Sequence, residues 1–341
     1  MQLTGIRQME MFDLPCPDLK TDTDVLVRML SVGVCGSDVH YYTNGRIGSQ
    51  VVQYPFTVGH EGSGIVEKVG SAVSSVQVGS RIAIEPAMPC RYCDQCLIGR
   101  SNTCRNLRFL GCPGQATGCL SEYIVMPESS CLPIPSSMSF EQAAISEPLA
   151  IGLYVSQLAG DLKGKNVAIL GSGPIGLSVL AGVRLSGASK VYMTDKINDR
   201  LVIASKSGAT ATFNVLDEDP VLEISKQEPL LLDFTFDCCG KQEALDQAVN
   251  LLKPGGKLVI VGIPEFSFFS FSVEHLRRRE LTIQNVRRQN GCDKEAIRAI
   301  DDGRVVVDHW VTHRFSFSAS KVAFDLVADY RDGVMKAMIN F

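Results

Sequence analysis

The chain lacks the features that mark proteins working on nucleic acid or at charged membranes. Its 341 residues carry 33 Lys and Arg against 37 Asp and Glu, which gives a formal net charge of -4. Binding to nucleic acid or to an anionic membrane surface depends on an excess of basic side chains. The chain also has no internal repeat and no low-complexity tract. We therefore expect neither a nucleic-acid nor a membrane partner.

Export signals and uninterrupted apolar helices are missing as well. Residues 1–5 lack the basic and then apolar pattern of a secretory leader, so we expect a cytoplasmic protein. Residues 167–183 are apolar enough to resemble a membrane span, but three glycines and Pro174 would interrupt such a helix early. A strand, a turn and a helix explain this run better.

Cysteine, in contrast, is plentiful. Without a leader, the twelve cysteines are expected to be metal ligands and reduced thiols, not a disulfide scaffold. Four of them form a C-x2-C-x2-C-x7-C cluster made of Cys90, Cys93, Cys96 and Cys104. Four thiolates close a tetrahedron around zinc, whereas a bacterial ferredoxin would need a shorter last gap. The spacing predicts a structural zinc, with disulfides or idle thiols as the alternative.

A second set of candidate metal ligands would leave one coordination position free. Histidine is scarce, with five in the chain, yet His60 lies next to Glu61, with Cys35 upstream and Glu147 downstream. Three protein ligands with one position left for water or substrate are how a catalytic zinc is held. A buried cysteine and a capping histidine are the alternative, because a sequence shows ligand types and not their convergence.

A nucleotide-binding pattern occupies the middle of the chain. A β-branched run at residues 167–170 leads into a glycine-rich turn and then a helix-like stretch; the turn is Gly171-Ser172-Gly173-Pro174-Ile175-Gly176. Such glycines allow a tight turn and let a pyrophosphate approach backbone N–H groups. A second strand, 190–194, ends at Asp195, which can hold ribose hydroxyls and favours NAD over NADP. Lys196 could instead attract a 2′-phosphate.

The pattern along the chain predicts two kinds of domain. Residues 1–145 hold short Val and Ile runs punctuated by glycine, which suits a barrel-like, mostly antiparallel domain. Further on, strands 232–237 and 257–262 flank a helix at 242–252, with a turn at 254–256, so an α/β, doubly wound parallel sheet is expected. We place the boundary near residues 148–152, before a helix that ends around Gly160.

Taken together, these motifs resemble the zinc-dependent medium-chain dehydrogenase/reductase (alcohol dehydrogenase) family. The likeness covers nearly the whole chain and includes Gly33-Val34-Cys35-Gly36-Ser37-Asp38-Val39-His40, Gly59-His60-Glu61, the four-cysteine lobe and the glycine-rich turn. Residues 39–48 and Ser146-Glu147-Pro148-Leu149-Ala150 are similar to the sorbitol and xylitol (polyol) dehydrogenase branch. The resemblance implies a GroES-like catalytic domain at 1–150 with a zinc lobe at 87–107, a Rossmann domain at 151–280, and a return to the catalytic domain at 281–341.

The resemblance also implies a reaction. Two zinc ions per chain are expected, and the catalytic one would be held by Cys35 and His60, with Glu61 and Glu147 as alternative third ligands. Zinc would polarise the alcohol oxygen of a polyol or sugar derivative. The carbinol carbon would then give its hydride to NAD. Ser37 and His40 match family positions that pass the alcohol proton toward solvent. A turn residue and a surface histidine are their alternatives.

Cofactor, substrate and assembly follow from the same likeness. The cofactor residues would be Gly171, Gly173, Pro174, Ile175, Gly176, Asp195, Lys196 and Arg200. The substrate residues would be Tyr41, Phe109 and Arg287. Arg288, next to Arg287, would suit a carboxylate-bearing or phosphorylated sugar, or it would face solvent or an interface. A sugar-acid 5-dehydrogenase, a threonine-type dehydrogenase, an NAD(P)-binding relative without zinc chemistry and a metal-binding regulatory protein remain alternatives. Because the family's cysteine lobe lies near subunit contacts, a homo-dimer or homo-tetramer is expected.

Overall fold

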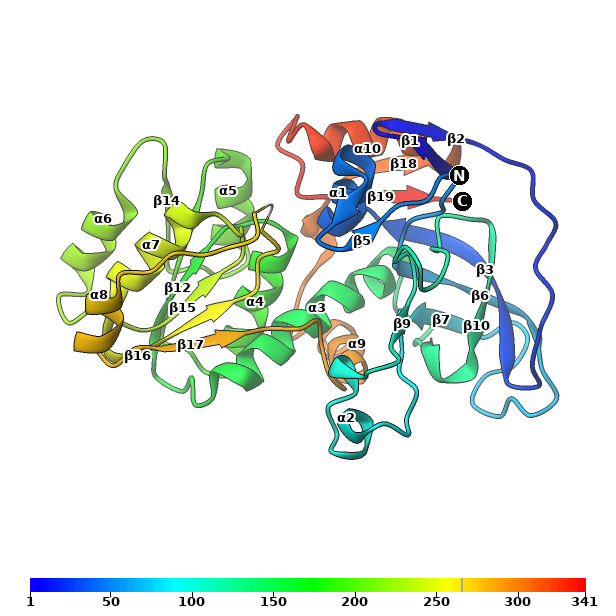
Figure 1. The fold of residues 1–341 in the computed structure, drawn as a ribbon, viewed down its shortest axis with the longest axis horizontal. Helices are drawn as coiled ribbons and strands as arrows, with labels where there is room; N and C mark the ends of the chain where they lie inside the picture. Colours follow the sequence, from blue (N-terminus) through cyan, green and yellow to red (C-terminus); the bar gives the residue numbers. More distant parts are fainter. Residues whose placement is uncertain (265) are drawn as a thin grey trace. The chain divides into compact units, whose positions relative to one another are not determined.

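Contacts within the computed structural model divide the chain into two compact units. The structure describes residues 1–264 and 266–341. Unit 1 consists of Met1–Glu147 and Asp293–Phe341, and unit 2 of Pro148–Cys292. Both ends of the chain therefore belong to unit 1, as the blue and red segments of Figure 1 show.

Unit 1 is built on a sheet of seven strands. Its order is β11-β7-β6-β3-β19-β18, with β10 also pairing with β3. The bounds are β3 Asp24–Gly33, β6 Glu61–Val69, β7 Arg81–Ile84, β10 Tyr123–Pro127, β11 Cys131–Pro133, β18 Val311–Ser316 and β19 Lys336–Asn340. All pairings are antiparallel except β18 with β19. β3 buries alternate residues, as expected for a strand with one face on a core.

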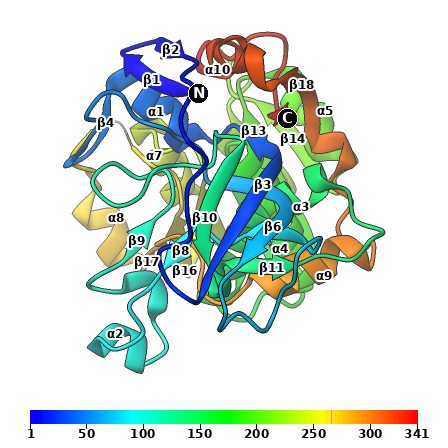
Figure 2. The same ribbon diagram turned by 90° about the vertical axis from the view of Figure 1, so that its right-hand side faces the viewer.

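Short elements surround this sheet and carry the motifs (Figure 2). They are β1 Gln2–Gly5, β2 Gln8–Glu10, α1 Gly36–Asn44, β4 Arg46–Ile47, β5 Gln50–Val51, β8 Ala87–Met88, α2 Asp94–Leu97, β9 Arg108–Phe109, α9 Asp293–Asp301 and α10 Ser320–Ala328. Four 3-10 turns are η1 Ser101–Thr103, η2 Glu128–Ser130, η3 Asp308–Trp310 and η4 Phe317–Ala319. The C-terminal strand β19 pairs with β3, so the end of the chain completes the sheet that the beginning starts.

Unit 2 is a parallel, doubly wound α/β domain. Its sheet has six strands in the order β14-β13-β12-β15-β16-β17. The strands are β12 Asn166–Leu170, β13 Lys190–Asp195, β14 Ala211–Asn214, β15 Leu232–Asp237, β16 Leu252–Ile260 and β17 Thr282–Asn285. The helices are α4 Pro174–Leu185, α5 Asn198–Lys206, α6 Pro220–Gln227, α7 Gln242–Leu251 and α8 Val273–Arg278. The fold class expected from the sequence, a mostly β domain plus a Rossmann domain, is confirmed.

Three local expectations were wrong. Helix α3 Phe140–Ala159 runs across the unit boundary. Unit 2 begins at Pro148, in the middle of this helix, whereas the boundary was expected to lie before a helix. Residues 254–256 were expected to form a turn but lie within β16. The register between β16 and β15 shifts at this part of the strand, between Leu232 and Phe234 of β15. Unit 2 also extends to Cys292 and not to residue 280, because β17 adds a further parallel strand beside β16.

Across the described parts of the chain, no helix combines the length and the apolar character needed to cross a membrane.

Candidate active site and metal centres

Cys35, His60 and Glu61 converge in unit 1. Cys35 is the residue before α1, His60 precedes β6, and Glu61 begins β6 opposite Gly33 of β3. One donor atom from each of the three lies within 4.8 Å of the others. Tetrahedral zinc with these ligand types needs donor separations of roughly 3.3–3.8 Å. The three side chains therefore fit a zinc ion after small adjustments, and the predicted convergence exists.

Gly33 makes room for the carboxylate of Glu61. A Cβ atom at this position would lie 2.2 Å from Oε2 of Glu61. Any larger residue would push the carboxylate away from the site. The glycine of β3 is thus explained by close approach across the β3–β6 pair.

His60 is oriented by Asp38. Its Nδ1 atom lies 3.2 Å from Oδ1 of Asp38, which also accepts the N–H of Gly59 at 3.1 Å. Burial lowers the pKa of His60, but the carboxylate of Asp38 and the thiol of Cys35 outweigh this and raise it well above its ordinary value. A carboxylate on one ring nitrogen leaves Nε2 to face a metal. Asp38 therefore positions the imidazole.

Glu61 is paired with a lysine from the end of the chain. Lys336, the first residue of β19, donates to Oε1 and Oε2 of Glu61 at 2.8 and 2.6 Å. Both side chains are almost fully buried, at 3% and 2% exposure. Although burial lowers the pKa of Lys336, Glu61 and Cys35 raise it above its ordinary value, so the lysine is charged.

Glu147 lies in α3 and is also buried. Burial raises its pKa to about 7; Glu61 and Asp293 add to this effect, and His60 and Lys336 oppose it. It is therefore within electrostatic reach of the ligand group, although it is not one of the three residues with donors inside 4.8 Å.

The other residues expected near the chemistry are divided between the units. The hydroxyl of Ser37 donates to Sγ of Cys35 at 3.4 Å, and the ring of Phe109 lies 5.3 Å from that of His60. His40 is half-buried on α1, and Tyr41 beside it donates to Oε1 of Gln50 at 3.1 Å. The structure thus brings Ser37 and Phe109 to the ligand group. Arg287 follows β17 in unit 2.

The four cysteines of the lobe form a second cluster. Sγ of Cys104 lies 3.4 Å from that of Cys90 and 3.8 Å from that of Cys93, and Cys96 completes the group. A disulfide would need about 2.05 Å, whereas thiolates around zinc are separated by roughly 3.8 Å. All twelve cysteines of the chain are free thiols. The cluster therefore fits a closed, four-thiolate zinc and excludes a disulfide within the lobe.

One thiol of the lobe, that of Cys90, ionises more readily than an ordinary cysteine. Burial raises the pKa of Cys90, but backbone N–H groups of Tyr92 and Cys93 outweigh it and lower the value to about 6. Burial and the neighbouring thiols raise the pKa of Cys96 to about 12. Without metal the four thiols are thus not all ionised, and binding zinc would release protons.

In unit 2 the glycine-rich turn joins β12 to α4. Gly171 has φ +104°, and a Cβ at Gly176 would lie 1.9 Å from the carbonyl oxygen of Gly171. The turn can close only with glycine there. A Cβ at Gly173 would meet nothing nearer than Nη1 of Arg200 at 3.5 Å, so space remains above this glycine. A pyrophosphate could use that space at the N-terminus of α4.

Asp195 is held beside this turn. Its Oδ2 accepts the N–H of Ser172 at 2.8 Å, and its Oδ1 accepts the N–H of Ile197 at 3.0 Å. The carboxylate at the end of β13 is therefore fixed next to the glycine turn, where a ribose would lie in a Rossmann fold. Lys196 is exposed and Arg200 is buried on α5.

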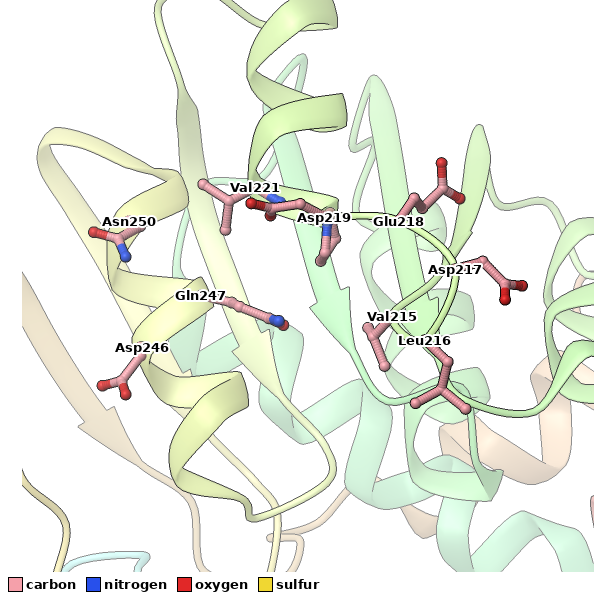
Figure 3. Close-up of a pocket in the computed structure, with 10 residues that line it drawn as sticks. Val215, Leu216, Asp217, Glu218, Asp219, Val221, Asp246, Gln247 and Asn250 are labelled. Carbon is pink, nitrogen blue, oxygen red and sulfur yellow. The ribbon is translucent and has the colours of Figure 1, made fainter.

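A hollow of about 630 Å³ lies elsewhere in unit 2 (Figure 3). It is lined by Val215–Val221, Asp246, Gln247 and Asn250. Four of the lining residues are acidic, and one of them, Asp219, caps α6 by accepting the N–H groups of Val221 and Leu222. Because this lining would repel phosphates, the hollow does not suit a dinucleotide.

Two residues of the site were missed by sequence reasoning. Asp38 lies in a motif that was recognised, and an acid three residues after a candidate ligand cysteine was a usable signal. Lys336 is 275 residues from its partner Glu61, and nothing in its neighbourhood marks it.

Comparisons with known proteins agree with this architecture. The family description "Alcohol dehydrogenase GroES-like domain" matches residues 21–136, and "Zinc-binding dehydrogenase" matches residues 174–302. Sorbitol dehydrogenase of Bacillus subtilis (strain 168) is 35% identical over 98% of this chain and 94% of its own. D-xylulose reductase A of Aspergillus niger is 35% identical over 95% of this chain and 92% of its own.

Solved structures are similar over the entire chain. An Escherichia coli oxidoreductase/dehydrogenase of unknown specificity involved in membrane biogenesis has a TM-score of 0.94 and 31% identity, and covers 100% of this chain and 99% of its own. A zinc-binding dehydrogenase from Sinorhizobium meliloti 1021 bound to NADP has a TM-score of 0.91 and 30% identity, with 100% and 98% covered. With the two ligand groups and the glycine-rich turn, these likenesses place the chain in the zinc-binding alcohol dehydrogenase family of oxidoreductases.

Proposed function

We propose that the protein oxidises a secondary alcohol of a polyol or sugar derivative to a ketone, with NAD as the hydride acceptor. The convergence of Cys35, His60 and Glu61 carries this proposal, because it supplies an open ligand set. Relatives named sorbitol dehydrogenase and D-xylulose reductase, aligned over nearly the full chain, support polyols as the substrate class.

The proposal includes two zinc ions per chain. The lobe cysteines would hold one, and Cys35, His60 and a carboxylate would hold the other. The second zinc, when bound, would supply Lewis-acid chemistry that lowers the pKa of the substrate hydroxyl. The protein's own part is to fix the imidazole through Asp38 and to exclude water around Glu61 and Glu147, which are buried.

Ser37 and His40 are proposed to carry the alcohol proton away from the site. The Ser37 hydroxyl already contacts Sγ of Cys35, and His40 lies one turn of α1 further on, half-buried. A hydroxyl followed by an imidazole can relay a proton because each both donates and accepts hydrogen bonds.

NAD is favoured over NADP because of Asp195. Its carboxylate is fixed by two backbone N–H groups and would accept ribose hydroxyls, while repelling a 2′-phosphate. The relative from Sinorhizobium meliloti binds NADP, so the choice within the family depends on such residues. Arg200, with the glycines, Pro174 and Ile175 of the turn, would complete the cofactor site, and Lys196 stays the residue that could favour NADP.

Tyr41, Phe109 and Arg287 are proposed as substrate contacts. Phe109 supports this role through its packing on His60. A sugar-acid 5-dehydrogenase and a threonine-type dehydrogenase are the second candidates, since the adjacent cations Arg287 and Arg288 suit an anionic substrate.

Assembly and location complete the proposal. A homo-dimer or homo-tetramer is supported by large apolar side chains that are exposed on the lobe, namely Tyr92, Leu97 and Ile98. The reducing cytoplasm is supported by the twelve free thiols, because unpaired thiols persist in a reducing compartment. Keeping the lobe thiols reduced is a condition for zinc binding.

A substrate panel tests the function. NADH absorbance is followed with polyols, sugar acids, sugar phosphates and threonine, each with NAD and with NADP. We expect NADH formation to be fastest with a polyol, and to be lost after zinc chelation. Preference for a sugar acid or threonine would select the second candidates, and absence of NADH binding would reject the enzyme.

A further inference from the structure

Gln50 is hydrogen-bonded to Tyr41, and this bond determines which of the two side chains can donate to a substrate. The hydroxyl of Tyr41 donates to Oε1 of Gln50 at 3.1 Å. A phenol has a single proton to donate, so the Tyr41 hydroxyl can offer a substrate only its acceptor lone pairs. Tyr41 is 5% exposed, whereas Gln50 is half-buried. The hydrogen-bond donor of this pair is therefore the amide of Gln50.

Cys112 lies on the other side of the Tyr41 hydroxyl. Its Sγ is 3.7 Å from Oη of Tyr41, and Cys112 is 2% exposed. Because the proton of Tyr41 is used toward Gln50, the thiol is the donor in this contact. A thiol, a phenol and an amide oxygen thus form a chain of hydrogen bonds in which each bond strengthens the next. The chain holds Oε1 of Gln50 toward Tyr41 and leaves Nε2 directed away from it.

A tight hairpin places Gln50 for this contact. In the β4–β5 pair Ile47 lies opposite Gln50, and the turn between them contains Gly48 at φ +55°. Directly opposite residues of an antiparallel pair project from the same face. Ile47 packs against the buried core of unit 1, whereas Val51, which follows Gln50, is 55% exposed. Gln50 therefore lies on the inward face of the hairpin.

The amide nitrogen of Gln50 is available to a ligand near the metal group. Within residues 1–264 and 266–341, Nε2 of Gln50 has no hydrogen-bond partner, and it is not fully buried. Contacts connect this amide to His60: the N–H of Cys112 donates to the carbonyl oxygen of Phe109 at 3.2 Å, and the ring of Phe109 packs on that of His60. Two N–H donors thus lie at the end of a chain of contacts that starts at a metal ligand.

We propose that Gln50 is a specificity-determining residue whose amide N–H group donates to a hydroxyl oxygen of the polyol other than the one that is oxidised. This rests on the proposed function. Tyr41 is then also a positioning residue, because its hydroxyl orients the amide. The contact favours substrates that carry a second hydroxyl over alcohols that lack one.

Kinetics with deoxy substrates test this contact. The substrates are the polyol that the wild type oxidises fastest and the analogues in which one hydroxyl, other than the reacting one, is replaced by hydrogen. In Gln50→Met, kcat/KM for the polyol should fall roughly three- to tenfold, as expected for one lost hydrogen bond between neutral groups. One deoxy analogue should show the same fall with the wild type, and no further fall with Gln50→Met.

Gln53→Met is the matched control. Gln53 is an exposed glutamine three residues further along the chain, and its replacement should leave kcat/KM unchanged for every substrate. Tyr41→Phe removes the hydroxyl that orients the amide. It should lower kcat/KM for the polyol when Gln50 is present and have no further effect in Gln50→Met. NADH binding and zinc content should be those of the wild type in all these variants.

No fall in Gln50→Met, or an equal fall for the polyol and for every deoxy analogue, would overturn the proposal, because Gln50 would then not bind a hydroxyl. Additive losses from Tyr41→Phe and Gln50→Met would overturn the positioning role of Tyr41. If Gln50→Met does not fold, Gln50→Leu is measured in the same way, and failure of both to fold would make Gln50 a structural residue and overturn the proposal. A wild type that oxidises no polyol would instead reject the proposed function.

Discussion

His60 is oriented by a residue three positions after Cys35, and not by its own neighbours in the chain. Asp38 follows Cys35 by one turn of α1 and reaches both the imidazole of His60 and the N–H of Gly59. Its other oxygen, Oδ2, is buried and makes no hydrogen bond within the described residues. A buried carboxylate is stabilised by a nearby positive charge, so the histidine and a metal behind it would satisfy the acid.

The first prediction at this scale concerns cofactor choice. Asp195→Ser should weaken NAD binding by about tenfold to a hundredfold, because one charge-assisted hydrogen bond contributes roughly 1.5–3 kcal/mol. The preference for NAD over NADP should narrow, since the carboxylate also repels a 2′-phosphate. Dissociation constants of NADH and NADPH, measured by fluorescence, check both statements.

Asp199→Ser is the matched control for that variant. It removes the same charge from an exposed position at the start of α5, and cofactor binding should not change. A wild-type preference for NADP, or equal effects of the two substitutions, would contradict the role of Asp195.

At the scale of elements, the lobe between β8 and β9 has little besides its thiols to order it. Helix α2 has four residues and none of them is buried, and Tyr92, Leu97 and Ile98 around it are exposed. Short elements without a core need another source of stability. Four thiolates on one metal supply it.

Cys93→Ser should therefore act on stability and not on the chemical step. We expect the melting temperature to fall by about 5 °C or more, and the oligomer to dissociate more readily, with a near-normal rate per intact active site. Cys16→Ser, which changes an exposed free thiol outside the lobe, is the control and should leave the melting temperature, the oligomer and the rate unchanged. Unchanged stability with a slowed hydride-transfer step would mean that the two metal sites have been assigned the wrong way round.

A second element-scale prediction concerns pH. Glu228, at the end of α6, accepts from Lys190, Tyr192 and Asn166 at 2.7, 2.6 and 2.8 Å. Burial raises its pKa, but these donors outweigh burial and lower it below the ordinary value. A carboxyl group whose pKa is lower in the folded state adds stability above its unfolded pKa, and this is lost as the pH falls through the folded value.

Glu228→Gln should thus lower the free energy of unfolding by roughly 1–3 kcal/mol at pH 7, and the difference should shrink as the pH falls below about 4. Urea unfolding at several pH values measures this. Glu223→Gln removes a charge on the same helix that pairs with the exposed Lys226, and it should cost little at any pH. A difference in the free energy of unfolding between Glu228→Gln and the wild type that does not depend on pH would contradict stabilisation by the ionised carboxylate of Glu228.

At the scale of the whole molecule, both ligand groups belong to unit 1 and the glycine-rich turn belongs to unit 2. Unit 1 is completed by the last strand, β19, which also supplies Lys336. Removal of the C-terminal segment would therefore affect the sheet and the site together.

Zinc content should be near two per chain. One open and one closed ligand group lead to this number, and elemental analysis after metal-sparing purification measures it. Cys35→Ser and Cys93→Ser should each contain about one, and only Cys35→Ser should lose turnover while keeping NADH binding. A wild type with a single zinc would remove one of the two assigned sites.

Features carried by neighbouring residues could be predicted from the sequence by itself. The lobe cysteines lie within fifteen residues of chain, and the glycine-rich turn needs only its own backbone conformation, so spacing and residue type were enough. The α/β fold class followed from alternating strands and helices, since hydrophobic periodicity is a local property.

Other features depended on which distant segments pack together. The pairing of β19 with β3 brings Lys336 to Glu61 across 275 residues, and the crossing of α1 with the turn before β6 brings Asp38 to His60 across 22. β17 joined unit 2 because the edge of β16 offered unpaired backbone groups, which no residue at 281–292 signals. Buried charges require partners, but burial exists only after folding, so the tertiary structure alone decided which residues restrain the ligands.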